Sequence, residues 1–86
     1  MRETPENRIK RLKMRSMRRG IKEMDLILTA YAGDRLADMS EAQITNYDAL
    51  LSENDQDLYQ WVTGQMAAPD HFSALISDIS EHSGAK

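Results

Sequence analysis

Apolar residues recur along this chain with the 3.6-residue period of an α-helix. The spacing i, i+3, i+4, i+7 occurs over residues 24–31, 58–65 and 72–79, with a polar residue only at the last position of the second window. A looser version covers residues 44–51. No window alternates apolar and polar residues long enough to predict a strand. The pattern therefore predicts an all-α protein, a compact bundle of five short helices.

Capping residues divide this pattern into separate helices. Typical starts are Thr4 before Pro5, Ser40 with Gln43, Asn54 with Asp57, and Pro69-Asp70. Expected stops are Gly20, Gly33 or the Asp34-Arg35 turn, and Gly64. The predicted helices cover roughly residues 5–18, 21–36, 40–52, 54–65 and 70–82. We expect one domain over residues 1–86, with residues 83–86 as a frayed tail.

The first predicted helix has an unusually thin apolar stripe. Ile9 and Leu12 share one face, but Ser16 follows where a third apolar residue is expected, and Met14 and Met17 lie on another side. Burial alone is too weak to orient such a helix. Its position must therefore depend on charge pairing with the rest of the fold or on a partner.

Charge is distributed very unevenly along the chain. The formal net charge is −3, but residues 1–22 contain nine Lys and Arg against two acids, and residues 23–86 contain two against twelve. The basic end is suited to a negative surface, whereas the acidic body repels nucleic acid and anionic lipid. The same polarity is also consistent with a first helix that pairs with the rest of the fold.

Three interpretations of the basic helix remain open. The first is a face that only contacts solvent, and the second is a protein-docking surface. The third is a nucleic-acid surface, for which Arg8, Arg11, Arg15 and Arg18 lie at helical spacing. Stacking aromatics are absent from the run, which disfavours nucleic acid. The planar donor fork of arginine suits carboxylates and carbonyls on a protein partner.

The sequence contains no recognisable catalytic, metal-binding or phosphate-binding motif. The chain has no cysteine, and its two histidines, His71 and His82, lack companions at metal-ligand spacing. Glycine-rich phosphate loops and calcium loops are absent as well. No apolar run approaches the ~20 residues of a membrane span. We therefore expect no enzyme, no metal site and no membrane insertion. Trp61 is predicted to lie in the core, and Tyr59 on the surface.

The arginine-rich stretch 8–19 is also compatible with a mitochondrial transit peptide. Glu3 and Glu6 are unusual in such a peptide, and the helical signals continue through the basic stretch. We interpret the segment as mature protein and expect a bacterial cytoplasmic location, with the mitochondrial matrix as the less favoured alternative.

Two motifs resemble the succinate dehydrogenase assembly factor family. Arg19, Gly20 and Glu23 match its Arg-Gly-x-x-Glu signature, and residues 55–61 resemble its Asp-x-Asp-Leu-aromatic-x-Trp element. Gln56 stands where many members have proline, and Met24 replaces a common leucine. Length, helical pattern and the positions of both motifs agree over residues 8–82.

The resemblance implies an assembly factor, a chaperone that binds the flavoprotein subunit of succinate dehydrogenase and promotes covalent attachment of FAD. FAD is then the cofactor of the client, and this chain binds none stably. Fumarate reductase is a further possible client, and the free protein is expected to be a monomer that does not bind nucleic acid. The alternatives are a nucleic-acid-associated small helical protein and a generic helical interaction module.

We expect the partner-binding surface to surround the first motif. The predicted contact residues are Arg15, Arg18, Arg19, Gly20, Glu23 and Asp25. Under the simplest alternative, Arg19 and Glu23 form an intrahelical i, i+4 pair worth about 0.3 to 0.5 kcal/mol, with Gly20 as a helix cap.

Overall fold

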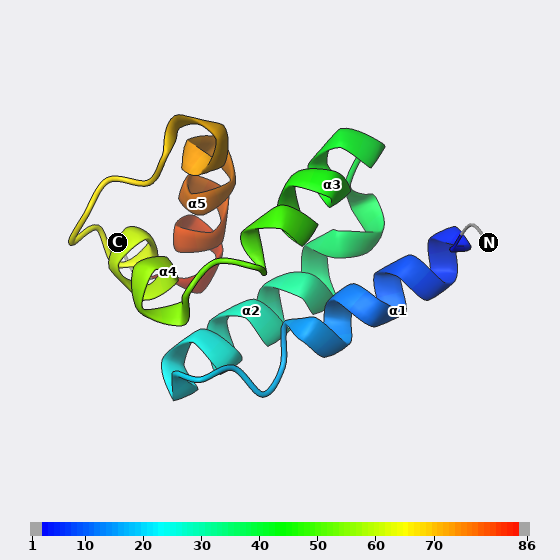
Figure 1. Cartoon of the computed structure of the whole chain (residues 1–86), viewed down its shortest axis with the longest axis horizontal. Coiled ribbons are helices and arrows are strands. Elements are labelled where there is room, and N and C mark those ends of the chain that lie inside the picture. Colours follow the sequence, from blue (N-terminus) through cyan, green and yellow to red (C-terminus); the bar gives the residue numbers. More distant parts are fainter. Residues whose placement is uncertain (1–2, 85–86) are drawn as a thin grey trace.

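The prediction of an all-α bundle is confirmed. A computed structural model describes residues 3–84, and over that range it contains helices and no strands. The elements are α1 (Pro5–Arg15), α2 (Lys22–Arg35), the 3-10 helix η1 (Leu36–Asp38), α3 (Glu41–Leu50), α4 (Asp55–Val62) and α5 (Asp70–Ser83) (Figure 1). Of the expected frayed tail, Ser83 ends α5 and Gly84 caps it, while residues 85–86 lie outside the described range.

Three of the predicted helix starts have the expected side-chain caps, whereas α5 begins after Pro69 as predicted but without a side-chain cap. The Thr4 hydroxyl accepts a hydrogen bond from the backbone N–H of Asn7 at 3.2 Å. Ser40 and Gln43 form a complete capping box, in which each side chain bonds the backbone N–H of the other residue. The Asn54 side chain accepts from the backbone N–H of Gln56 at 2.8 Å. Local side-chain chemistry thus fixes these starts as the sequence indicates.

Two of the predicted ends were wrong. Helix α1 stops at Arg15 instead of residue 18, because the Ser16 hydroxyl donates back to the Leu12 carbonyl and Arg18 adopts a left-handed φ of 54°. Helix α4 stops at Val62 instead of residue 65. There the Thr63 hydroxyl donates to the Tyr59 carbonyl at 2.7 Å, and Gly64 follows with a φ of 82°.

For the end of the second helix, the sequence leaves two alternatives, Gly33 and the Asp34-Arg35 turn. Gly33 lies within α2, which continues to Arg35 and passes directly into η1. Of the two alternatives for this end, the Asp34-Arg35 turn is the closer one.

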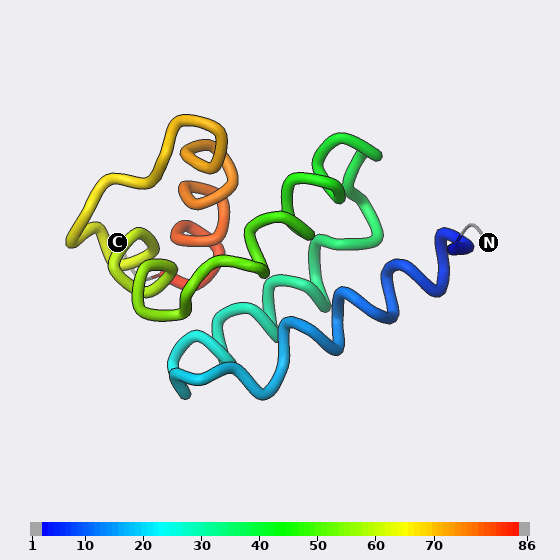
Figure 2. The backbone as a smooth tube through the Cα atoms, in the orientation of Figure 1, coloured from blue at the N-terminus to red at the C-terminus, as the bar shows by residue number. Residues whose placement is uncertain are grey.

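Helix α2 lies at the centre of the fold and contacts α1, η1, α4 and α5. In the chain trace, α1 and α2 run side by side along one edge, α3 lies above α2, and α4 and α5 close the other end (Figure 2). The buried face of α2 consists of Met24, Leu28, Tyr31 and Ala32, which the helical pattern predicts in part. Each of the remaining helices also contributes fully buried side chains, and together they form one core.

The thin stripe of α1 is completed by a polar contact. Ser16 is fully buried, and its hydroxyl lies 2.6 Å from the hydroxyl of Tyr47 in α3 while it donates to the Leu12 carbonyl at 2.8 Å. Burial raises the pKa of Tyr47, so its hydroxyl remains neutral and available for this bond. Ser16 therefore substitutes for the missing apolar residue.

Trp61 was expected in the core and Tyr59 on the surface, but the two side chains are similarly buried. Trp61 is only partly buried, with its ring centroid 6.1 Å from that of Phe72, and Tyr59 is partly buried as well. Both side chains pack against the core, so neither is a freely exposed anchor.

Candidate functional site

The first motif is divided between a loop and a helix, with Arg19 and Gly20 in the loop and Glu23 in the first turn of α2. Residues 16–21 connect α1 to α2, and Arg18 within them has a positive φ. The i, i+4 pair between Arg19 and Glu23, which the simplest alternative requires, does not form, because Arg19 precedes α2 and turns toward α4. This intrahelical alternative is therefore wrong.

Arg19 joins three helix ends. Its guanidinium donates to the carbonyl of Arg15 at 3.0 Å, at the end of α1, and to the carbonyl of Leu51 at 3.2 Å, at the end of α3. It also donates through Nε to Oδ1 of Asp55 at 2.8 Å, at the start of α4. A cation at two helix C-termini and a carboxylate at a helix N-terminus both suit the helix dipoles.

Asp55 also holds Gly20. One carboxylate oxygen receives Arg19, and the other accepts the backbone N–H of Gly20. A Cβ at Gly20 would lie 3.1 Å from that oxygen, which is tighter than ordinary contact. Glycine at this position thus permits the close approach of the loop to α4. We call Arg19, Gly20 and Asp55 the clamp.

The clamp brings the two sequence motifs together. Arg19 and Gly20 belong to the first motif, and Asp55 is the first acid of the second. The side chains of Arg19 and Asp55 are only 12% and 16% exposed. Sequence reasoning missed Asp55 as a site residue, although its position in a second motif of the family was a usable signal.

The remaining predicted contact residues differ in accessibility. Arg18 and Glu23 are exposed, and within residues 3–84 their side chains make no ion pair. Asp25 is partly buried and accepts a hydrogen bond from the Thr29 hydroxyl at 3.2 Å. Arg15 is bound to Asp48 at 2.6 Å. Arg18 and Glu23 are thus the residues of this group best placed to meet a partner.

A shallow hollow adjoins the clamp. It has a volume of about 380 Å³ and is lined by the backbone turn at Gly20 and Ile21 and by residues 53–56 at the start of α4. The hollow is wide open to solvent. Its shape follows from the clamp, because the two segments that line it are the ones that Asp55 joins.

The other arginines of α1 form a row against α3. Arg8 pairs with Glu41, and Arg11 and Arg15 share the carboxylate of Asp48 at 3.1 and 2.6 Å. The hydrogen bond from Arg11 holds the pKa of Asp48 below its ordinary value. Several arginines of α1 are therefore already paired with carboxylates of the same chain. This geometry supports the pairing of the first helix with the acidic body and leaves fewer free arginines for phosphate contacts.

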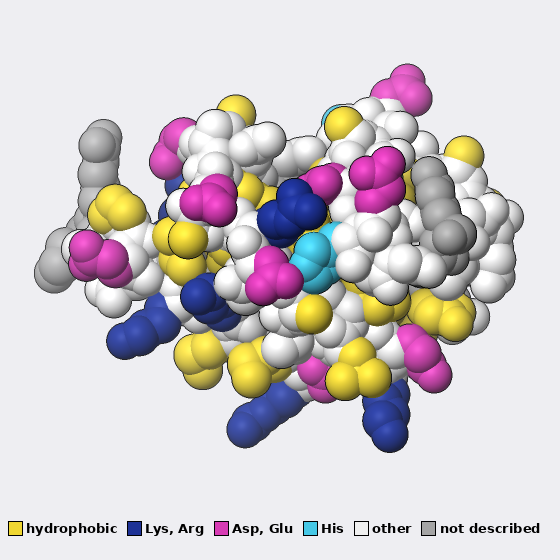
Figure 3. All heavy atoms as spheres, turned by 180° about the vertical axis from the view of Figure 1, so that it is seen from behind, with side chains coloured by type: hydrophobic (Ala, Val, Ile, Leu, Met, Phe, Trp, Pro, Cys, Tyr) yellow, Lys and Arg dark blue, Asp and Glu magenta, His cyan; other side chains and the backbone are white. Residues whose placement is uncertain are grey.

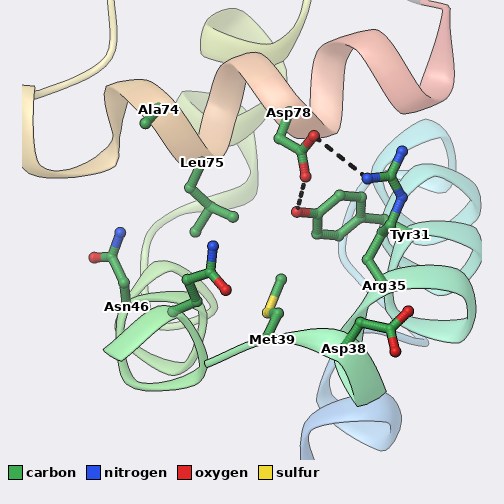
Figure 4. Close-up of a pocket in the computed structure, with 9 residues that line it drawn as sticks. Tyr31, Arg35, Asp38, Met39, Asn46, Ala74, Leu75 and Asp78 are labelled. Carbon is green, nitrogen blue, oxygen red and sulfur yellow. Dashed lines mark hydrogen bonds and ion pairs between the residues drawn. The ribbon is translucent and has the colours of Figure 1, made fainter. Parts of the chain in front are cut away.

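A second hollow, of about 400 Å³, lies between α2, η1, α3 and α5 (Figure 4). On one side Tyr31 donates to Asp78 at 2.6 Å, and Arg35 lies 3.6 Å from the same carboxylate. Burial, together with this hydrogen bond, raises the pKa of Tyr31. These contacts tie α5 to α2. Beside them, His82 meets Asp34 at 2.7 Å.

Within residues 3–84, no group of three or more His, Asp or Glu side chains is arranged to hold a metal ion. None of the helices in that range has the length and apolar character needed to cross a membrane.

Comparison with known proteins decides the family. Residues 10–83 match the family described as flavinator of succinate dehydrogenase. The chain belongs to this family. It is 38% identical over 78 residues to "Succinate dehydrogenase assembly factor 2, mitochondrial" of Schizosaccharomyces japonicus, which covers 88% of this chain and 54% of the relative. The protein of the same name from Schizosaccharomyces pombe is 34% identical over 82 residues, covering 93% of this chain and 59% of the relative.

These relatives correct the expected location. The chain spans about half the length of the curated relatives it matches. Both relatives described above are eukaryotic proteins named as mitochondrial. The prediction of a bacterial cytoplasmic protein is therefore wrong, and the comparisons point to the mitochondrion instead.

Proposed function

We propose that this flavinator-family chain binds the flavoprotein subunit of succinate dehydrogenase and promotes covalent attachment of FAD to that subunit. Membership of the family supports the proposal directly. The chain acts as an assembly factor and not as a catalyst, so the reacting groups belong to the client and its flavin. The chain itself holds no FAD stably and is a monomer when free. Fumarate reductase is a second client of the chain.

One structural observation carries the proposal. Glu23 stands exposed in the first turn of α2, unpaired within residues 3–84, beside a loop whose path the clamp fixes. A carboxylate at a rigidly held position can bond a complementary donor without first being ordered, which lowers the cost of association. We assign the predicted contact residues two roles accordingly.

In the proposed division of roles, Arg19 and Gly20 shape the loop. Their polar groups are bound to Asp55 and to helix ends, so they are largely unavailable to a partner. Arg18 and Glu23 contact the client, and Arg15 and Asp25 border this contact. In the family motif, Arg19 and Gly20 thus fix the shape of the surface, and Glu23 contacts the client.

Reconstitution tests the proposed function. The purified flavoprotein subunit, without flavin, is incubated with FAD in the presence or absence of this chain, and covalent flavin is measured by fluorescence after denaturing electrophoresis. We expect the wild-type chain to increase covalent flavin and Glu23→Gln to do so much less. The matched control is Glu81→Gln, which alters an exposed carboxylate on α5. Equal flavin incorporation with and without the wild-type chain would contradict the proposal.

A further inference from the structure

Among residues 3–84, most of the strongly exposed large hydrophobic side chains lie near the junction of α1 and α2. Within the described residues, four are strongly exposed, namely Met14 at 70%, Leu26 at 64%, Met66 at 57% and Met17 at 45%. Single exposed hydrophobic residues are ordinary on protein surfaces, but a group of them indicates an interaction site. Three of the four, Met14, Met17 and Leu26, lie where α1 ends and α2 begins. We call these three the Met–Leu face.

Hydrogen bonds bring these three residues to the same part of the surface. The backbone N–H of Met17 donates to the Met14 carbonyl at 3.1 Å, so the two methionines occupy one turn. The carbonyl of Ser16, directly before Met17, accepts from the Thr29 hydroxyl of α2 at 3.3 Å. Leu26 lies one helical turn before Thr29, and i, i+3 positions are neighbours on a helix surface. The face therefore spans the junction of the two helices.

Unpaired cations lie next to the face along α1, the loop and α2. Lys10, Lys13, Arg18 and Lys22 are exposed, and none of them forms an ion pair with a residue in the described range 3–84. By contrast, the arginines on the other side of α1 pair with α3. Figure 3 shows hydrophobic side chains along the lower edge of the molecule between projecting Lys and Arg side chains, with Asp and Glu side chains among them.

We infer that the Met–Leu face is a second contact surface for the flavoprotein client, and that it fits an apolar patch bordered by carboxylates. The inference rests on the proposed function. Leu26 lies three residues after Glu23, on the adjacent turn of α2, so the face continues the proposed contact at Glu23. Charge complementarity favours an acidic rim on the partner. Methionine side chains adapt their shape to an irregular apolar surface, which suits a chaperone that binds and releases its client.

An anionic membrane is the other surface to which basic and apolar residues bind. Glu23 and Asp25 lie in the same turns of α2 and would face the lipid phosphates unfavourably. A protein with both donors and acceptors can accommodate these carboxylates as well as the cations. The observations therefore favour the flavoprotein.

The double variant Met14→Ser/Leu26→Ser tests the inference, with Met66→Ser as a matched control at a similarly exposed position outside the face. We expect the dissociation constant for the purified flavoprotein subunit to rise by about tenfold or more in the double variant, as for loss of an apolar anchor. The control should stay within about twofold of wild type. Helical circular dichroism and the melting temperature should remain near wild-type values for both, because the altered side chains are exposed.

Three other outcomes of the binding experiment would contradict the inference. If the double variant binds as tightly as wild type while Glu23→Gln binds weakly, the inference is overturned and the proposed function stands. If the wild-type chain does not bind the flavoprotein, the proposed function fails and this inference with it. If the double variant keeps its flavoprotein affinity but no longer sediments with phosphatidylcholine–phosphatidylglycerol vesicles that bind wild type, the face is a membrane surface and the inference is overturned.

Discussion

Two groups of arginine–carboxylate contacts connect the helices of this protein, and they differ in what surrounds them. The row on α1 pairs Arg8, Arg11 and Arg15 with carboxylates that remain in contact with solvent, such as the 83% exposed side chain of Glu41. In the clamp, Arg19 and Asp55 are 12% and 16% exposed, and both also bond backbone groups. Similar residue types thus occupy two different environments.

The difference teaches which contacts the fold depends on. Exposed pairs contribute about 0 to 1 kcal/mol each, because water and salt screen them and long side chains lose freedom. Removing one partner of a largely buried, hydrogen-bonded pair leaves the other charge poorly solvated and costs several times more. The clamp also determines a backbone path, whereas the row only aligns one helix. Substitutions in the two groups should therefore have unequal effects.

The largest effect is expected for Asp55→Ala. This change leaves the Arg19 guanidinium without its carboxylate and the Gly20 N–H without its acceptor. We expect a loss of about 2 to 3 kcal/mol in the free energy of unfolding, measured by urea denaturation. Asp57→Ala, two residues further along α4, removes an exposed acid and should cost less than about 1 kcal/mol. Equal losses in the two variants would contradict the structural role of the clamp.

A pair of glycine substitutions should shift stability in opposite directions. Gly20→Ala places a Cβ 3.1 Å from Asp55 Oδ2, so we expect a loss of about 1 kcal/mol as the carboxylate moves. Gly33→Ala adds a methyl group with nothing within 4 Å, inside α2, and should gain about 0.5 to 1 kcal/mol from helix propensity. Thermal unfolding of both variants gives the comparison. Stabilisation by alanine at both sites would show that the loop does not need the close approach.

The smallest effect belongs to the row on α1, whose Asp48 is more accessible to solvent than Asp55, and it depends on pH. Because Arg11 lowers the pKa of Asp48 in the folded state, the unfolded chain binds the proton first as the pH falls. The stabilisation is therefore present above the unfolded pKa of about 4 and is lost below it. Asp48→Asn should be less stable than wild type at pH 7, by less than about 1 kcal/mol, and the difference should shrink toward pH 2.

Urea midpoints between pH 7 and pH 2 measure this convergence. Asp57→Asn, which removes a carboxylate without a partner on α1, serves as the control. If the gap between wild type and Asp48→Asn is unchanged at low pH, the row does not depend on the charge of Asp48.

The sequence predicted the helices well because their signals are local. Repeating apolar positions and capping residues such as Ser40 with Gln43 act within one or two turns, so the starts of the helices are confirmed. The ends of α1 and α4 were less predictable. They depend on the back-bonding hydroxyls of Ser16 and Thr63 and on a left-handed arginine, features that spacing alone does not reveal.

The candidate site could be predicted only in part because it is assembled from distant segments. Both motifs were visible in the sequence, but the contact of Arg19 and Gly20 with Asp55 spans about 35 residues. Periodicity gives no information at that separation. The helical interpretation paired Arg19 with Glu23, its neighbour along the chain. In the fold, Arg19 instead meets the less solvated carboxylate of Asp55 and also donates to the carbonyls at two helix ends.

Binding and stability measured together on Glu23→Gln test the central claim most directly. The claim is that the clamp shapes the loop while Glu23 contacts the flavoprotein. We predict that the dissociation constant for the flavoprotein subunit rises by about tenfold or more, as for loss of a charged hydrogen bond at an interface. The melting temperature should fall by no more than a few degrees, because an exposed acid in the first turn of a helix contributes less than about 1 kcal/mol. Wild-type affinity in Glu23→Gln, or a melting temperature that falls in parallel with the affinity, would contradict the account.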